Sequence, residues 1–101
     1  MKATLLITGT IQGVGYRSHV KRCAHQHHIR GFVRNLPDGR VEVFAAYDDH
    51  QDFDAFLKEL DRKSTSFIGM HVEKIEVHHE GKPGFVDEGD FGPGVDFQIR
   101  F

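Results

Sequence analysis

The sequence predicts an α+β domain in which an antiparallel sheet carries two helices on one face. Two observations lead to this class. Short stretches with an apolar residue at every second position recur along the 101-residue chain, as is typical of half-buried strands. Two other stretches repeat their apolar residues at helical spacing. Their order along the chain predicts β-α-β-β-α-β, followed by a short strand at the C-terminus.

The first strand and helix flank a glycine-rich stretch. A strand is predicted over residues 3–8, where both faces carry apolar groups. A helix is predicted from Tyr16 to His28, with an apolar stripe opposite a basic face. Cys23 lies on that stripe, which favours a small core residue over a nucleophile.

A β-hairpin is predicted over residues 32–47. Its two strands flank Pro37-Asp38-Gly39, in which proline fixes φ and glycine tolerates a positive φ. Asp48 or Asp49 can then cap the second helix. The stripe of that helix, at i, i+3, i+4 and i+7, is Phe53, Phe56, Leu57 and Leu60.

The sequence after the second helix predicts a loop at residues 64–69 and two more strands, at residues 70–79 and 95–101. Val72 is out of phase with Ile75 and Val77, so we expect a bulge near Glu73-Lys74. The whole order is that of the ferredoxin-like split β-α-β sandwich.

A long stretch from Glu80 to Gly94 separates the last two strands and holds five glycines and two prolines. It could cover a sheet edge or alter access to a site, and the sequence leaves both open. Its acidic residues Asp87, Glu88 and Asp90 match no calcium-loop spacing, which favours a solvated acidic loop.

Composition limits the class of protein. The length suits one domain, residues 1–101, and the shares of 39% hydrophobic and 28% charged residues are those of an ordinary soluble domain. The net charge of −2 argues against a nucleic-acid partner. One cysteine fits a reducing compartment. No apolar run approaches the ~18 residues of a membrane span, and no signal-peptide pattern opens the chain. We expect a cytoplasmic monomer.

The glycine-rich stretch at residues 9–17 is the candidate binding site. Three glycines in seven positions allow the backbone to curl and to point several N–H groups inward. The following helix adds its own N-terminal N–H groups, so phosphate could bind there. Arg17 could supply further donors. The alternative is a tight turn with a surface arginine, and the stretch matches neither of the common nucleotide-binding glycine motifs.

Two segments resemble the signatures of a known family. Gly-Thr-Ile-Gln-Gly-Val-Gly-Tyr-Arg at residues 9–17 resembles the first signature of the acylphosphatases, G-x-V-Q-G-V-x-[FY]-R. Gly-Phe-Val-Arg-Asn-Leu-Pro-Asp-Gly-Arg-Val at residues 31–41 resembles their second signature. The closing residues 97–101 are similar to their C-terminal strand. Tyr47 departs from the pattern, because the family often has glycine there.

The resemblance implies an activity and the residues that perform it. Members of this family hydrolyse acyl phosphates to a carboxylate and inorganic phosphate, without a metal or cofactor. It implies that Arg17 binds the phosphate and that Asn35 orients the attacking water. The backbone N–H groups implied to bind the same phosphate are those of Gln12, Gly13, Val14, Gly15, Tyr16 and Arg17. Phosphate and sulfate are implied as anion ligands. From its position alone, Asn35 could instead be a turn residue.

Three other functions remain open from the sequence. A non-catalytic anion or ligand-binding module on the same fold would not need a water-positioning amide. RNA binding by the sheet would need exposed aromatics among basic residues, and Glu42 and the net charge oppose it. A zinc site could use His19, Cys23 and His27 on one helix face, but the sequence places no carboxylate with them at ligand spacing.

Overall fold

The computed structural model describes residues 1–12, 15–61 and 71–101, so the loop expected at residues 64–69 lies outside them. The predicted element order is confirmed. The elements are β1 (Lys2–Thr10), α1 (Tyr16–Gln26), β2 (Arg30–Asn35), β3 (Val41–Ala46), α2 (His50–Leu60), β4 (His71–His79) and β5 (Gln98–Arg100).

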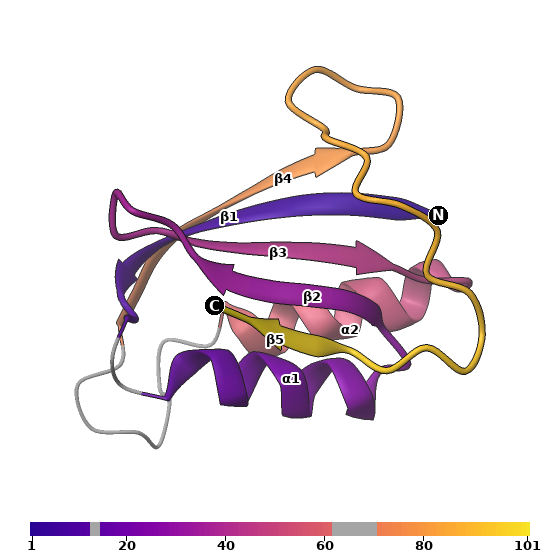
Figure 1. Cartoon of the computed structure of the whole chain (residues 1–101), viewed down its shortest axis with the longest axis horizontal. Helices are drawn as coiled ribbons and strands as arrows, with labels where there is room; N and C mark the ends of the chain where they lie inside the picture. The colour runs from indigo at the N-terminus through magenta and orange to yellow at the C-terminus, as the bar shows by residue number, and fades with distance from the viewer. Residues whose placement is uncertain (13–14, 62–70) are drawn as a thin grey trace.

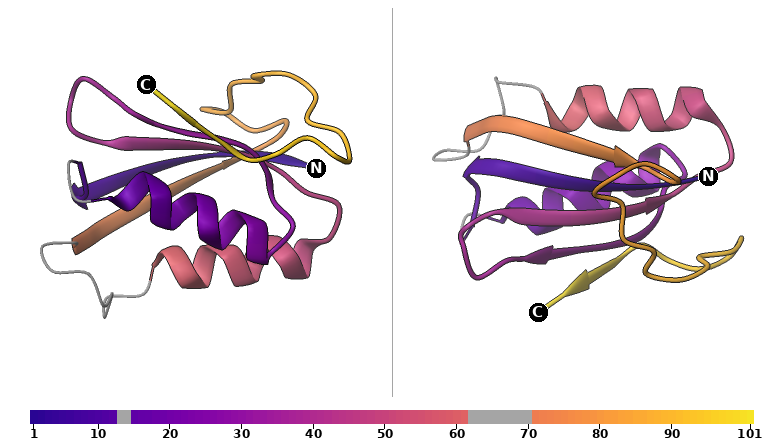
Figure 2. Two further views of the ribbon diagram at one scale, coloured as in Figure 1. Left: turned by 60° about the horizontal axis from the view of Figure 1, so that its bottom comes forward. Right: turned by 90° about the horizontal axis from the view of Figure 1, so that it is seen from above.

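The five strands form one sheet in the order β4-β1-β3-β2-β5. The four longer strands are antiparallel, as predicted. The short β5 runs parallel to β2, which makes the sheet mixed. Both helices lie on the same face of the sheet (Figures 1 and 2). The last strand is shorter than predicted, since only three of residues 95–101 join the sheet.

The main core fills the space between the helices and the sheet. The inward residues of β1 and β3 pack against the apolar stripes of α1 and α2. Phe53 and Phe56, from the predicted stripe of α2, are buried. Tyr47, the departure from the family pattern, is also buried and stacks on Phe53 with ring centroids 4.4 Å apart. The larger side chain therefore serves the core.

The predicted bulge is confirmed in β4. Thr8 pairs with Lys74, but the next residue of β1, Gly9, pairs with Val72. Glu73 is therefore the extra residue on β4. A Cβ atom at Gly9 would overlap the carbonyl oxygen of His71, so the close approach of the two strands requires glycine.

The other face of the sheet is crossed by a segment that we call the strap, residues 80–97. It joins β4 to β5, which lie at opposite edges of the sheet. Because the helices occupy one face, the strap crosses the opposite face, near the N-terminal end of β1 (Figure 1). The length of this connection follows from its path, since it must pass three strands about 4.8 Å apart.

Candidate active site

A cavity of about 280 Å³ lies where α1 begins, next to the ends of β2 and β5. Both side chains expected to act in catalysis, Arg17 and Asn35, line it. Arg17 comes from the first turn of α1 and Asn35 is the last residue of β2. The fold thus brings together two polar residues that are far apart in the sequence. Among the described residues, the lining consists of Ile11, Gly15, Tyr16, Arg17, Ser18, Asn35, Ile99 and Phe101.

Arg17 is held at the cavity by the C-terminal strand. Its Nη1 donates a hydrogen bond of 3.1 Å to the backbone carbonyl of Arg100. Its guanidinium carbon lies 4.6 Å from the centroid of the Phe101 ring. A guanidinium has five N–H donors, so a bond to one carbonyl leaves capacity for an anion in the cavity.

Asn35 has an unsatisfied oxygen at this cavity. Its Oδ1 is buried, and no donor in the described part of the chain reaches it. Buried polar atoms are usually hydrogen-bonded, so such an atom calls for an explanation. An amide oxygen can accept a hydrogen bond from water or from a ligand.

The described part of the glycine-rich loop has the conformation that a curled turn needs. Gly15 precedes α1 with φ 80° and ψ 14°, a left-handed conformation that favours glycine. Gln12 donates from Nε2 to the carbonyls of Leu36 and Arg40, at 2.9 and 3.0 Å. Gly13 and Val14 lie outside the described residues, so their N–H groups as phosphate donors stay a prediction.

The ring of Tyr16 belongs to the core. It is 1% exposed, and burial raises the pKa of its hydroxyl. The side chain therefore anchors the start of α1, and the expectation for this residue rests on its backbone N–H alone.

Sequence reasoning missed the apolar part of the lining and the carbonyl that holds Arg17. Ile11, Ile99 and Phe101 line the cavity beside the polar groups. No polar side chain marks these positions, and a backbone carbonyl has no signal in a sequence. Only the similarity of residues 97–101 to the family's last strand pointed to this segment.

Cys23 lies away from the cavity, between the two helices. It is buried and its Sγ donates to Oε2 of Glu59 at 3.2 Å. Burial, followed by this hydrogen bond, raises the pKa of the thiol to about 12, which leaves very little nucleophilic thiolate at neutral pH. Among residues 1–12, 15–61 and 71–101, no group of three or more His, Cys, Asp or Glu could hold a metal ion.

The sheet offers no aromatic platform at β2 and β3. Phe32 and Phe44 are fully buried beneath the strap, against Phe85 and Phe91. Rings in this position are not available to stack on RNA bases.

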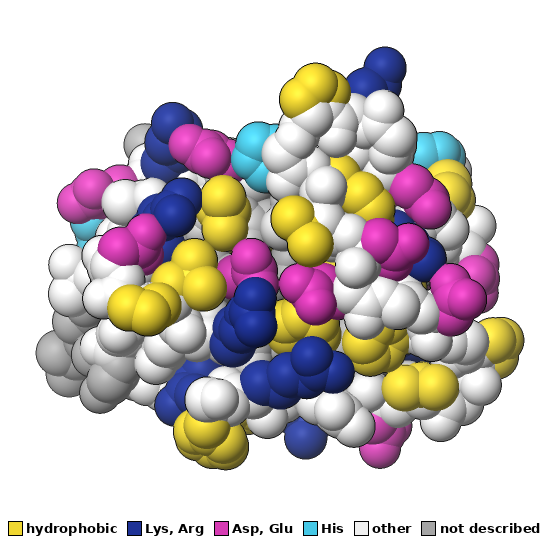
Figure 3. All heavy atoms as spheres, turned by 45° about the horizontal axis from the view of Figure 1, so that its top comes forward, with side chains coloured by type: hydrophobic (Ala, Val, Ile, Leu, Met, Phe, Trp, Pro, Cys, Tyr) yellow, Lys and Arg dark blue, Asp and Glu magenta, His cyan; other side chains and the backbone are white. Residues whose placement is uncertain are grey.

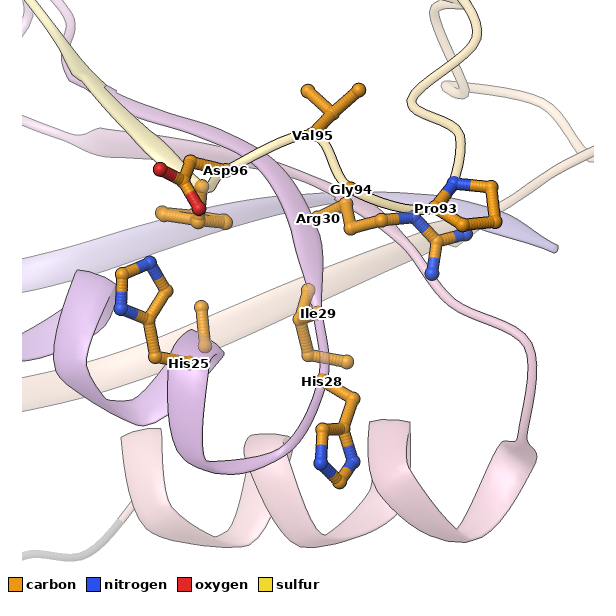
Figure 4. A pocket seen from close by; sticks show the side chains of 10 residues that line it. His25, His28, Ile29, Arg30, Pro93, Gly94, Val95 and Asp96 are labelled. Atoms are coloured by element: carbon orange, nitrogen blue, oxygen red, sulfur yellow. The ribbon is translucent and has the colours of Figure 1, made fainter.

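A second, more open cavity of about 390 Å³ lies between the end of α1 and the last residues of the strap. Figure 4 shows His25 and Asp96 on one side of it and Arg30 and Pro93 on the other. Arg30 already donates to the Phe91 carbonyl and to the Asp48 carboxylate. None of the described residues of the predicted site lines this cavity.

Comparisons with known proteins identify a single family. Residues 3–92 match the family model described as Acylphosphatase. An acylphosphatase from Alkalilimnicola ehrlichii is 58% identical over 80 residues, which are 79% of this chain and 89% of that protein. One from Methanocella arvoryzae is 36% identical, over 84% of this chain and 97% of its own.

Solved structures show the same fold. The crystal structure of an acylphosphatase from Bacillus subtilis superposes with a TM-score of 0.77, covering 99% of this chain and 98% of that chain at 24% identity. In the described part of this chain, no helix is long and apolar enough to cross a membrane. The family match and the two relatives show that this chain belongs to the acylphosphatase family.

Proposed function

We propose that this protein hydrolyses acyl phosphates, with Arg17 binding the phosphate and Asn35 orienting the attacking water. The observation that carries the assignment is the meeting of both side chains at one cavity, with the Asn35 oxygen buried and without a donor among the described residues. The type of reaction, hydrolysis of an acyl phosphate, follows from membership of the acylphosphatase family.

The reaction requires the protein mainly to neutralise charge and to position the reactants. Water attacks phosphorus, the bond from phosphorus to the acyl oxygen breaks, and the carboxylate leaves with the bonding pair. Phosphoryl transfer depends mainly on stabilising the equatorial oxygens and aligning the nucleophile. Arg17 and the backbone N–H groups of residues 12–17 would neutralise those oxygens. The water proton would pass to the phosphate itself, so the reaction needs no metal and no strong general base.

The proposal covers residues 1–101 as one domain that acts as a cytoplasmic monomer on a small-molecule substrate. The single cysteine and the net charge of −2 support a reducing compartment and a partner other than nucleic acid. Inorganic phosphate or sulfate would occupy the loop as a competitive inhibitor.

Arg17→Ala tests the phosphate site. Each charge-assisted hydrogen bond to the substrate is worth about 1.5–3 kcal/mol, so the variant should lose at least about tenfold in kcat/KM and bind inorganic phosphate correspondingly more weakly. Activity should be assayed on a small acyl phosphate after exhaustive chelation with EDTA, which should leave the parent activity intact.

Lys21→Ala is the matched control, because it removes another cation from α1 that does not line the cavity. It should keep parental activity and phosphate affinity. Parental phosphate binding by Arg17→Ala would show that the loop assignment is wrong. Activity lost to EDTA and restored by a divalent metal would refute the metal-independent mechanism.

A further inference from the structure

The strand that holds Arg17 is itself weakly anchored by backbone pairing. β5 is a three-residue edge strand, and it pairs with β2 through Gln98, Ile99 and Arg100. Because a three-residue edge strand forms few ladder hydrogen bonds, side-chain contacts must contribute to fixing its position. The carbonyl that accepts from Arg17 belongs to its last residue, Arg100.

The side chain of Arg100 lies over the face of the sheet opposite the helices. Its guanidinium carbon lies 4.0 Å from the centroid of the Phe32 ring, a cation–π contact. Phe32 is fully buried and stacks on Phe44, with centroids 5.9 Å apart. Arg100 therefore rests on a ring that cannot move freely.

The strap completes the support of that ring. Phe91 contacts both Phe32 and Phe44, with ring centroids 6.2 and 5.5 Å away. Its own carbonyl accepts a 2.6 Å hydrogen bond from Nε of Arg30, a residue of β2. Phe91 is therefore tied to the same strand that β5 pairs with.

Ion pairs connect the strap to this face of the sheet. Lys2 pairs with Asp87 and Asp90 at 3.1 and 2.8 Å, and Arg34 lies 3.8 Å from Glu88. Figure 3 shows basic and acidic side chains side by side over this face. These ion pairs join the strap to β1 and β2.

We propose that Phe91 and Arg100 are positioning residues for Arg17. Phe91 supports Phe32, Phe32 supports the Arg100 side chain, and the Arg100 carbonyl then directs the Arg17 guanidinium into the cavity. This inference rests on the proposed role of Arg17 in phosphate binding. Preorganisation of a binding side chain improves affinity because less freedom is lost when the ligand binds.

Two strap residues provide a matched test that changes no charge. Phe85 and Phe91 both pack on Phe44, at 6.1 and 5.5 Å, but the contact with Phe32 belongs to Phe91. Phe91→Leu should raise KM for a small acyl phosphate and the inhibition constant of inorganic phosphate about three- to tenfold. Phe85→Leu should leave both at the parental value. Both variants are assayed well below their melting temperatures.

Arg100 separates positioning from charge. Arg100→Met removes the nearer of two cations on the Phe32 ring, since the guanidinium carbon of Arg34 lies 5.6 Å from the ring centroid. The variant should weaken phosphate binding to a similar extent as Phe91→Leu. Arg100→Lys keeps a cation that can lie over the ring, so it should restore part of the loss.

The phosphate inhibition constants of these variants decide whether the positioning role holds. Equal phosphate inhibition constants for Phe91→Leu and Phe85→Leu would overturn the proposal, whatever their melting temperatures, because the proposal depends on the contact with Phe32 that Phe91 makes. Arg17→Ala is measured in parallel. If Arg17→Ala binds phosphate as the parent does, the proposed function fails. If it loses phosphate while Phe91→Leu does not, only the positioning role fails.

Discussion

At the scale of single residues, the end of α1 carries a strained backbone. His28 has φ 58°, the left-handed conformation that glycine usually adopts after a helix. The N–H of Ile29 donates to the Ala24 carbonyl at 2.8 Å, which closes the helix in a Schellman-type ending. A histidine at this position costs more than glycine because of its Cβ atom.

His28→Gly should therefore stabilise the protein. We expect the free energy of unfolding to rise by about 0.5–1 kcal/mol, after the extra flexibility of glycine in the unfolded chain is subtracted. The exposed contact of His28 with Asp52, at 3.6 Å, is worth little. Denaturant unfolding measures the change.

His25→Gly serves as the control for this prediction. His25 is exposed in the last turn of α1, where glycine lowers helix stability by about 1 kcal/mol. If both substitutions destabilise the protein to the same extent, the backbone of His28 is not the source of strain.

The catalytic candidates show what sequence can supply at this scale. Arg17 and Asn35 could be named from two signature segments, and the structure places them at one cavity. The Gln12 side chain could not be predicted to bind the carbonyls of Leu36 and Arg40, because backbone acceptors leave no mark in a sequence. The same reason hides the Arg100 carbonyl that holds Arg17.

At the scale of elements, the strap is the part that the sequence described least. Its glycines and prolines predicted a loop but no path, since a segment without periodicity does not show which face it covers. The strands were predictable because their alternation marks the buried face. The parallel pairing of β5 follows from the path of the strap, so it could not be predicted from local pattern.

The strap should become less firmly held in acid. The hydrogen bonds that Lys2 donates to Asp90 and Asp87 raise the pKa of Lys2. The Gly89 N–H, and then Lys2, lower the pKa of Asp87. A lowered carboxyl pKa stabilises the fold above the ordinary aspartate value of about 3.9, and this contribution is lost as the pH falls through the lowered pKa.

Lys2→Met measures this contribution. The parent should melt at a higher temperature than the variant between about pH 5 and 8, and the gap should close as the pH falls below about 4. On the alkaline side, the gap should close as the pH rises through the raised pKa of Lys2. Lys82→Met, which changes an exposed lysine of the same strap, provides the control. A gap that does not change from pH 2 to 8 would contradict the role of the ion pairs.

At the scale of the whole molecule, the strap and the cavity lie at different ends of the sheet. The strap crosses the sheet near the beginning of β1 (Figure 2). The cavity lies where α1 begins and β2 and β5 end. The central strands β1 and β3 connect these regions through one packed core. The candidate active site can therefore hold an Asn35 oxygen that has no donor among the described residues, since stability is supplied elsewhere.

The central claim is that Asn35 acts on the attacking water, and Asn35→Ala tests it most directly. Because Asn35 would contribute mainly in the transition state, kcat for a small acyl phosphate should fall about 10²–10³-fold. The phosphate inhibition constant should stay near the parental value. The melting temperature should not fall, because the Oδ1 that is removed accepts no hydrogen bond from the described residues. A stable Asn35→Ala protein with parental kcat would contradict the account, as would a variant whose loss of activity follows its loss of stability.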